Sequence, residues 1–357
     1  MSEHFLGIVG TPDINNYNKN VYSGVSTLQN LNTLNSLVPV PVATLTYPSV
    51  EGGFGGGSEF PLSKSDFPLV LYADETVYPY GAYKLVLNEN LKFQFDIWGG
   101  GGWATSNAGC SGGGHTTYTA NFSIDDVVGL YIAGTSFDLP AESLASGKPG
   151  GWPDGGHGGT GASYHGYGGA GSSRIGPWYS TLAAMNHSSA TYYAIAGGAG
   201  GRHGYSATSG PGGGTTGGTA PEGSYFAGGG GGGTQTAGGT GGAASSYGGA
   251  GLPGSKYQGG NGVAYSTYGG GGGGGGGYYG GGAGGTVYAS GGGGSGYINT
   301  SFSGYVSGSG ATSQGTFHAT NGGQSPAGSN SNKPYIAGAS GGAGDPNHTG
   351  AIVITLV

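Results

Sequence analysis

The sequence predicts a mainly β protein: a small antiparallel β-structure or sandwich that carries a packed bundle of glycine-rich extended helices, with little α-helix. Three observations predict this class. Glycine accounts for 92 of the 357 residues, several times its ordinary usage. Short segments with the alternating polar and apolar pattern of half-buried strands interrupt the glycine tracts. Charged residues make up only 7% of the chain, whereas disordered chains are usually highly charged.

The N-terminal part has a different composition, since only nine of the 92 glycines precede Ile97. Leucine recurs there at every third position, at Leu28, Leu31, Leu34 and Leu37, a period that fits neither an α-helix nor a strand. A short amphipathic helix over residues 21–37, an extended arm that docks on a neighbouring subunit, and a frayed terminus all remain open. We expect residues 1–90 to form an extended attachment and assembly segment, and residues 91–357 to form the glycine-rich domain.

Strand signals follow in order along the chain. In residues 91–98, Leu91, Phe93, Phe95 and Ile97 alternate with polar residues, which is the period of a half-buried strand. Residues 117–124 and 127–133 flank Asp125 and Asp126 and predict a hairpin with an acidic turn. Residues 191–196 predict a further strand. The uninterrupted apolar run of residues 351–357 predicts a strand at the middle of a sheet.

Between these last two strands lie tracts that no strand would tolerate, among them residues 228–233 and 269–277, which are glycine throughout. The strict Gly-X-Y period of collagen is absent. Extended helices of the polyproline and polyglycine II kind have three residues per turn and no internal hydrogen bonds. Without side chains, several such helices can pack together and bond laterally through their backbones. We therefore expect a bundle of polyglycine II helices.

The order of these elements resembles the glycine-rich domain of the anaplastic lymphoma kinase and leukocyte tyrosine kinase receptors, a module that also occurs in bacterial and viral glycine-rich proteins. The resemblance covers about residues 91–357. It rests on the strand of residues 93–98 with the glycines that follow, the 122–132 unit, and the segments 168–175, 193–198, 291–299 and 350–354. In residues 168–175 the Asp and the terminal Arg of the family's element are displaced. The resemblance implies a small β-structure capped by polyglycine II helices, and a scaffold or binding role without catalysis.

Sequence motifs typical of catalytic or ligand-binding sites are sparse, so we expect that the protein is not an enzyme and binds no cofactor or metal. Copies of G-x-G-x-x-G arise by chance in such a sequence, and none has the surroundings of a dinucleotide site. His157, His165 and His203 could approach one another but lack the spacing of a zinc site. A net charge of −7 argues against nucleic acid as a partner. The apolar run at residues 351–357 is too short to span a bilayer, so membrane insertion is not expected.

Tyrosine is the commonest large side chain, with 26 copies. Amphipathic rings on a rigid, weakly charged surface suit the binding of saccharides or proteins. The alternative is that the rings simply pack over the glycine helices. The residues that we expect to contact a receptor or glycan are Trp152, Tyr164, Tyr167, Tyr278, Tyr279 and Tyr297.

An extracellular type of composition without a visible signal peptide or paired cysteines is typical of a virus particle. The sequence therefore predicts a virion structural protein, such as a tail fibre, spike or capsid-associated component, displayed on the virion surface and contributing to host attachment. We expect it to be a homo-oligomer that joins other virion or surface subunits through residues 1–90 and contacts a host-surface glycan or protein. The alternative is a microbial cell-surface or extracellular matrix filament protein. A soluble ligand-binding or ice-binding module is a third hypothesis.

Overall fold

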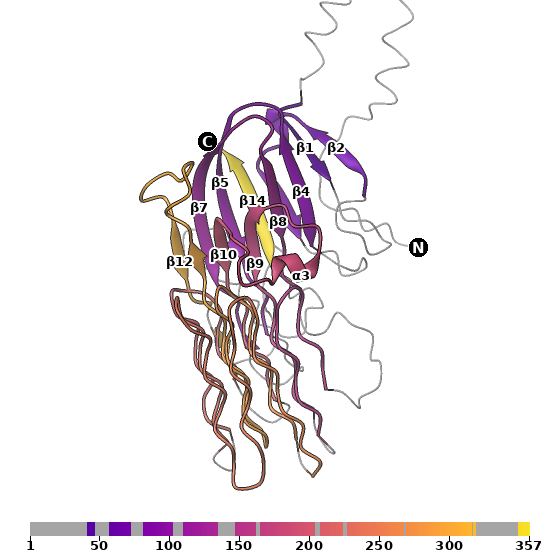
Figure 1. Ribbon diagram of the computed structural model, residues 1–357, viewed down its shortest axis with the longest axis vertical. Helices are drawn as coiled ribbons and strands as arrows, with labels where there is room; N and C mark the ends of the chain where they lie inside the picture. Colours follow the sequence, from indigo (N-terminus) through magenta and orange to yellow (C-terminus); the bar gives the residue numbers. More distant parts are fainter. Residues whose placement is uncertain are drawn as a thin grey trace, which may run out of the picture.

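The computed structural model describes residues 41–46, 57–72, 81–102, 110–134, 147–161, 165–203, 208–223, 227–267, 269–315, 317–318 and 349–357 (Figure 1). Within these residues the regular structure is almost entirely strand, as predicted. Two antiparallel sheets form a sandwich, and the glycine tracts extend from one end of it as a long bundle (Figure 1). The helices described are two short turns, η1 (Lys64–Asp66) and α3 (Leu182–Met185).

The five-stranded sheet has the order β12-β7-β5-β14-β3. Its strands are β3 (Leu69–Tyr72), β5 (Leu91–Trp98), β7 (His115–Phe122), β12 (Ala311–Ser313) and β14 (Ala351–Leu356). β14 lies between β5 and β3, with Ile352 opposite Ile97 on one side and opposite Leu71 on the other. This arrangement confirms the central position predicted for the last strand.

The seven-stranded sheet has the order β11-β10-β9-β8-β4-β1-β2. Its strands are β1 (Ala43–Thr46), β2 (Glu59–Leu62), β4 (Ala82–Leu87), β8 (Val127–Tyr131), β9 (Ser173–Pro177), β10 (Ala194–Ala196) and β11 (Tyr297–Ile298). A separate pair joins β6 (Cys110–Ser111) to β13 (Phe317–His318). Strands β1 to β4 precede residue 91. β3 pairs with β14 and β4 pairs with β8, both of which follow residue 91, although the composition changes there. Residues 21–37, for which a helix was one interpretation, lie outside the described part of the chain.

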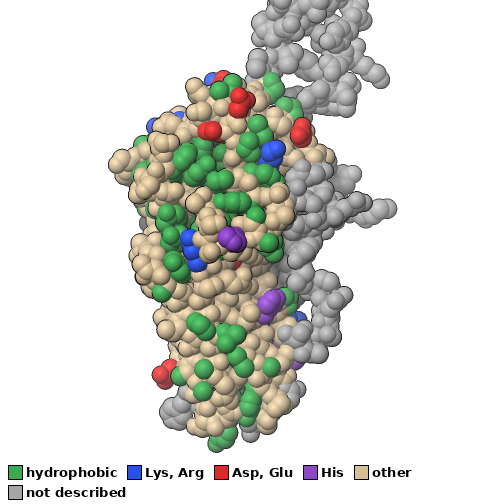
Figure 2. Space-filling view, viewed as in Figure 1, with side chains coloured by type: hydrophobic (Ala, Val, Ile, Leu, Met, Phe, Trp, Pro, Cys, Tyr) green, Lys and Arg blue, Asp and Glu red, His purple; other side chains and the backbone are tan. Residues whose placement is uncertain are grey.

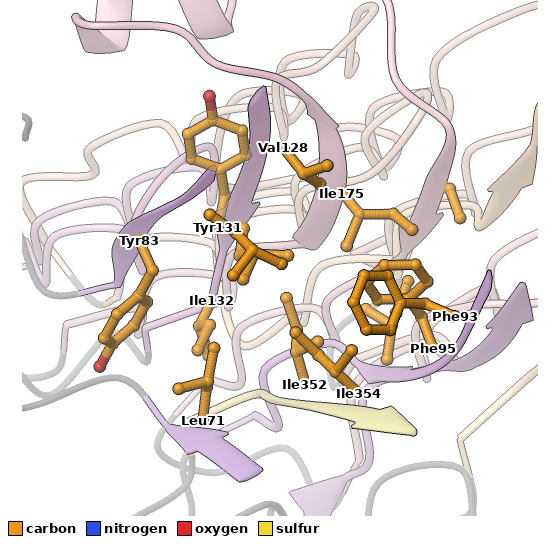
Figure 3. Close-up of a cluster of buried hydrophobic side chains, with 14 of the residues drawn as sticks. Leu71, Tyr83, Phe93, Phe95, Val128, Tyr131, Ile132, Ile175, Ile352 and Ile354 are labelled. Atoms are coloured by element: carbon orange, nitrogen blue, oxygen red, sulfur yellow. The ribbon is translucent and has the colours of Figure 1, made fainter. Parts of the chain in front are cut away.

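The core lies between the two sheets (Figure 3). Phe93 and Phe95 of β5 and Ile352 of β14 come from one sheet, and Val128 of β8 and Ile175 of β9 come from the other. All five side chains are buried. The alternation seen in residues 91–98 therefore has its expected cause, because successive side chains of a strand point to opposite faces.

The expected hairpin at Asp125 and Asp126 is wrong. β7 pairs with β5 and β12, whereas β8 pairs with β4 and β9, so the turn carries the chain from one sheet to the other. Its turn role is confirmed: Asp125 has a left-handed φ of 66°, and the Asp126 carboxylate accepts a bond of 2.7 Å from the Ser123 N–H. Alternation indicates that a strand is half-buried, but it does not select the partner strand.

The glycine tracts form a laterally bonded bundle, which we call the glycine array (residues 147–171, 197–203, 208–223, 227–296 where described). Residues 269–277 are buried at its centre. Their N–H groups donate to three neighbouring tracts, at residues 167–170, 260 and 289–292, and their carbonyl groups accept from three more, at residues 156–159, 198–201 and 281–284.

These bonds repeat with a period of three residues. Gly272 and Gly275 donate to one neighbour, at Ala289 and Gly292, with both bonds 2.9 Å long. The residues between them donate to other tracts. Three residues per turn is the period that polyglycine II helices have, so the bonding agrees with the lateral packing expected from the sequence. A Cβ on Gly274 would overlap the carbonyl group of Gly281, which explains why the centre of the array is glycine.

Candidate binding surface

A buried ion pair joins the array to the sandwich. Arg174 on β9 and Asp154 in the array are both wholly shielded from solvent, and Arg174 Nη2 donates to Asp154 Oδ2. Arg174 also donates to Ser172 Oγ at 2.8 Å and to the Tyr192 hydroxyl at 3.2 Å. Asp154 accepts from the Ser172 N–H at 2.7 Å and from its hydroxyl at 2.8 Å. The two charges are therefore compensated by each other and by hydrogen bonds, as buried charges must be.

This pair fixes how the array meets the sheets. The Asp154 carboxylate occupies the space that a Cβ on Gly276 would need, and the Asp154 carbonyl accepts a bond of 2.9 Å from the Gly259 N–H. Burial raises the pKa of Asp154, and the nearby Arg174 opposes that shift. Burial lowers the pKa of Arg174, but Asp154 and the Tyr192 hydroxyl together outweigh that effect and raise the pKa above its usual range. Removing either partner would leave a buried charge without compensation.

Three of the predicted contact residues gather where the array meets β11. The Tyr278 and Tyr297 rings are stacked, with centroids 4.0 Å apart and 15° between their planes. Tyr279 lies edge-on to Tyr278 at 5.2 Å. All three are half-buried, and burial raises the pKa of Tyr278 and of Tyr297. These rings contact one another, as the packing interpretation of the tyrosines requires.

The remaining predicted residues lie elsewhere. Trp152 is 7% exposed and belongs to the hydrophobic core. Tyr167 is half-buried within the array, and its N–H donates to the Arg202 carbonyl at 2.8 Å. Tyr164 lies outside the described residues. The structure therefore brings together Tyr278, Tyr279 and Tyr297, and does not place Trp152 or Tyr167 with them.

Sequence reasoning missed the residues that link these rings to the core. Tyr257 lies edge-on to Tyr278 at 5.9 Å and to Tyr192 at 5.3 Å. The Arg174 guanidinium lies 5.0 Å from the ring centroids of both Tyr192 and Tyr257, at cation–π distance. One signal was present, because Asp154 and Arg174 are the two charged residues in positions 151–200. Two isolated residues of opposite charge in an otherwise uncharged segment favour an ion pair between them.

The three histidines differ in their surroundings. His157 is exposed, His165 is half-buried, and His203 is buried. Burial, together with Arg202 and His165, lowers the pKa of His203 to about 4. In the part of the chain that the structure describes, no group of three or more His, Cys, Asp or Glu residues could hold a metal ion.

A cleft of about 380 Å³ lies at the sandwich end farthest from the array. Leu91, Phe122 and Leu356 form its apolar lining, and the Lys64–Glu89 ion pair of 2.7 Å lies at its rim. The other lining residues are Asn90, Lys92, Asn121 and Val357. The side-chain amide of Asn88 donates to the Pro41 carbonyl at 3.1 Å, so residue 41, to which residues 1–40 are joined, also lies at this end.

No family model matches the sequence, and no curated protein is similar to it. The helices of the described residues are too short to span a bilayer.

Proposed function

We propose that this chain is a non-catalytic structural protein of a virion, a fibre, spike or capsid-associated component displayed outside the particle. In this proposal the sandwich end, with the segment of residues 1–40, joins other subunits. The glycine array projects outward and contributes to host attachment. The observation that carries the proposal is the contrast between the two ends of the molecule.

The sandwich end has the features of an attachment surface. It holds the cleft, the exposed apolar side chains of Ile124 and Val357, which are 54% and 60% exposed, and the junction with residues 1–40. Its described charged residues are Lys64, Asp66, Glu89, Lys92, Asp125 and Asp126. Most of the charged side chains visible in Figure 2 lie on the sandwich. Mixed charge around apolar surface is typical of a protein interface.

The array has the features of a durable projection. Between residues 208 and 295 the described charged residues are Glu222 and Lys256. Backbone hydrogen bonds to several neighbouring tracts hold its interior. Local opening, which would expose the backbone to a protease, should therefore be rare. A rigid and nearly uncharged rod of this kind suits a position outside a particle.

The test is electron microscopy of the native assembly, labelled with an antibody raised against residues 200–340. We expect label on the outside of virus particles or their appendages. Label on cell-envelope filaments in preparations without particles would overturn the proposal and support the matrix alternative. A chain that lacks residues 1–40 serves as the matched variant: it should fold with an unchanged melting temperature and fail to join particles.

A further inference from the structure

The turns at the far end of the array form one continuous surface. Turns at residues 160–161, 245–249, 263–267 and 286–288 lie at the end of the array away from the sandwich, and we call them the distal turns (Figure 1). The Thr286 N–H and hydroxyl both donate to the Gly249 carbonyl, at 3.0 and 3.1 Å. The Tyr265 N–H donates to the Thr160 carbonyl at 2.8 Å. These bonds join the turns in two pairs. Gly249 lies beside Val263 and so brings the pairs together, since an added Cβ on Gly249 would be 3.5 Å from Val263 Cγ1.

Three of the four distal turns carry a tyrosine. Tyr247 is 55% exposed, and Tyr265 and Tyr288 are half-buried. Small hydroxyl residues stand beside them, at Ser245, Ser246, Ser266, Thr267 and Thr286. Tyrosine with serine, threonine and glycine on a rigid support is the composition of many recognition loops, because tyrosine gives a large amphipathic contact at low entropic cost.

The turn at residues 286–288 holds its tyrosine in an unfavourable backbone conformation. Val287 and Tyr288 have φ of 70° and 76°, in the left-handed region that glycine occupies without strain and a β-branched residue rarely adopts. Val287 is 1% exposed and anchors the turn. The Tyr288 ring packs edge-on against His203 at 4.8 Å. The chain has 92 glycines, yet valine and tyrosine occupy these two positions, where glycine would be free of backbone strain. Backbone strain of this kind is often retained at binding sites.

The distal turns contain no charged residue among the positions described. Two charged residues lie near Tyr288: Glu222 is exposed and adjoins Gly223, whose added Cβ would lie 2.5 Å from the Tyr288 carbonyl oxygen, and Arg202 is only 5% exposed. An exposed carboxylate and a buried guanidinium disfavour sialylated, sulfated or phosphorylated ligands, which bind through accessible arginine and lysine. The turns also lack the tryptophan, arginine and methionine that anchor most protein interfaces. The surface matches a ligand that has apolar C–H faces, many hydroxyl groups and no charge.

We infer that the distal turns bind a neutral saccharide. Sugar C–H faces pack on the rings of Tyr247 and Tyr288, and the sugar hydroxyls bond with the tyrosine hydroxyls and with the exposed side chains of Ser266 and Thr267. The inference rests on the proposed function in that it names the host-surface ligand, and it assigns binding to the distal turns rather than to the Tyr278–Tyr297 stack. A shallow site of this kind binds weakly, and several copies on one particle would raise the avidity.

The test uses the full-length protein on an array of neutral, sialylated and sulfated oligosaccharides, followed by calorimetry with the neutral oligosaccharide that binds best. We expect Tyr247→Ala and Tyr288→Ala each to weaken binding about tenfold or more. Tyr247→Phe keeps the ring and should lose less. Tyr279→Ala, at the opposite end of the array, is the matched control and should stay within about twofold. Because Tyr247 is mostly exposed, its substitution should leave the melting temperature unchanged.

Other outcomes separate this inference from the proposed function. Binding only to charged glycans, affinity that falls steeply with salt, or an equal loss in Tyr279→Ala would overturn the saccharide site. Absence of any glycan binding, with antibody label still on virus particles, would do the same and leave the virion proposal standing. Neutral-glycan binding that Tyr247→Ala abolishes, together with label on cell-envelope filaments, would support the site and overturn the virion proposal.

Discussion

In the sandwich, the buried groups are mainly side chains such as Phe93, Phe95 and Ile352. In the centre of the array, they are peptide groups that bond with six neighbouring tracts. Both regions meet the requirement that buried backbone groups be hydrogen-bonded, the sandwich along its strands and the array in all lateral directions. A chain can therefore build an ordered interior with almost no side chains, provided that each peptide group finds a partner in another tract.

The two regions should therefore fail in different ways. A hydrophobic core tolerates substitutions that conserve volume. The array interior has no side-chain volume that a substitution could conserve, because a Cβ added to Gly274 or Gly281 would overlap a neighbouring backbone.

The largest effect is expected from Gly274→Val. The added side chain displaces the backbone of Gly281, and the displaced tract also loses hydrogen bonds worth about 1 kcal/mol each, so we expect a loss of at least about 5 kcal/mol. Hydrogen exchange should show the array opened while β5 and β14 stay protected. Gly249→Ala is the control, since its Cβ would meet only Val263 Cγ1 at 3.5 Å. Equal melting temperatures for the two variants would contradict the steric account of the array.

The next effect concerns the junction. Arg174→Met leaves the Asp154 carboxylate buried without its cation, and we expect a destabilisation of about 3–5 kcal/mol by urea unfolding. The double variant Arg174→Met/Asp154→Leu removes both charges and should be more stable than the sum of the single effects implies. Strictly additive losses would show that the pair does not couple the array to the sandwich.

A pH effect of intermediate size is expected from His203. Its folded pKa of about 4 lies below the unfolded value of 6.5, so the unfolded state binds the proton more tightly. The stability lost through His203 should therefore grow as pH falls below 6.5 and level off below about 4, with a difference of about 2 kcal/mol between pH 7 and pH 5. Urea titrations at the two pH values measure it. His203→Gln should remove most of this difference, and a profile unchanged by the substitution would count against a neutral buried His203.

The smallest effect is expected at the sandwich end. Lys64 and Glu89 form an ion pair of 2.7 Å, but their side chains are 61% and 41% exposed. Glu89→Gln should change the free energy of unfolding by less than about 1 kcal/mol, because water and salt screen exposed pairs. Thermal denaturation in low and high salt measures it. A loss as large as that of Arg174→Met would remove the distinction between buried and exposed charges on which the comparison rests.

Local patterns predicted much of the fold. The alternation in residues 91–98 and the apolar run at residues 351–357 located β5 and β14, since burial on one or both faces leaves a direct pattern in the sequence. The choice of partners was not predictable: residues 117–133 look like a hairpin but supply strands to different sheets. Pairing across the sandwich depends on contacts between distant segments, and no local signal specifies them.

The candidate sites show the same division. Tyrosine content directed attention to Tyr278, Tyr279 and Tyr297, and the structure shows these rings packed together. The pairing of Arg174 with Asp154 spans 20 positions of sequence. The strain at Val287 and Tyr288 depends on backbone angles that the sequence does not display. The distal turns became recognisable as one surface only when the tracts were assembled.

The absence of room for a Cβ in the array has a genetic consequence. Every glycine codon begins with two guanines, and a change in either base replaces glycine with a residue that has a side chain or stops translation. The central tracts, such as residues 271–276, can therefore vary in natural populations almost solely by silent changes at the third base. The turns between tracts carry this restriction at fewer positions, because residues with side chains already occupy many of them. Selection acting on this gene would thus leave a periodic record, with constant tracts separated by variable turns.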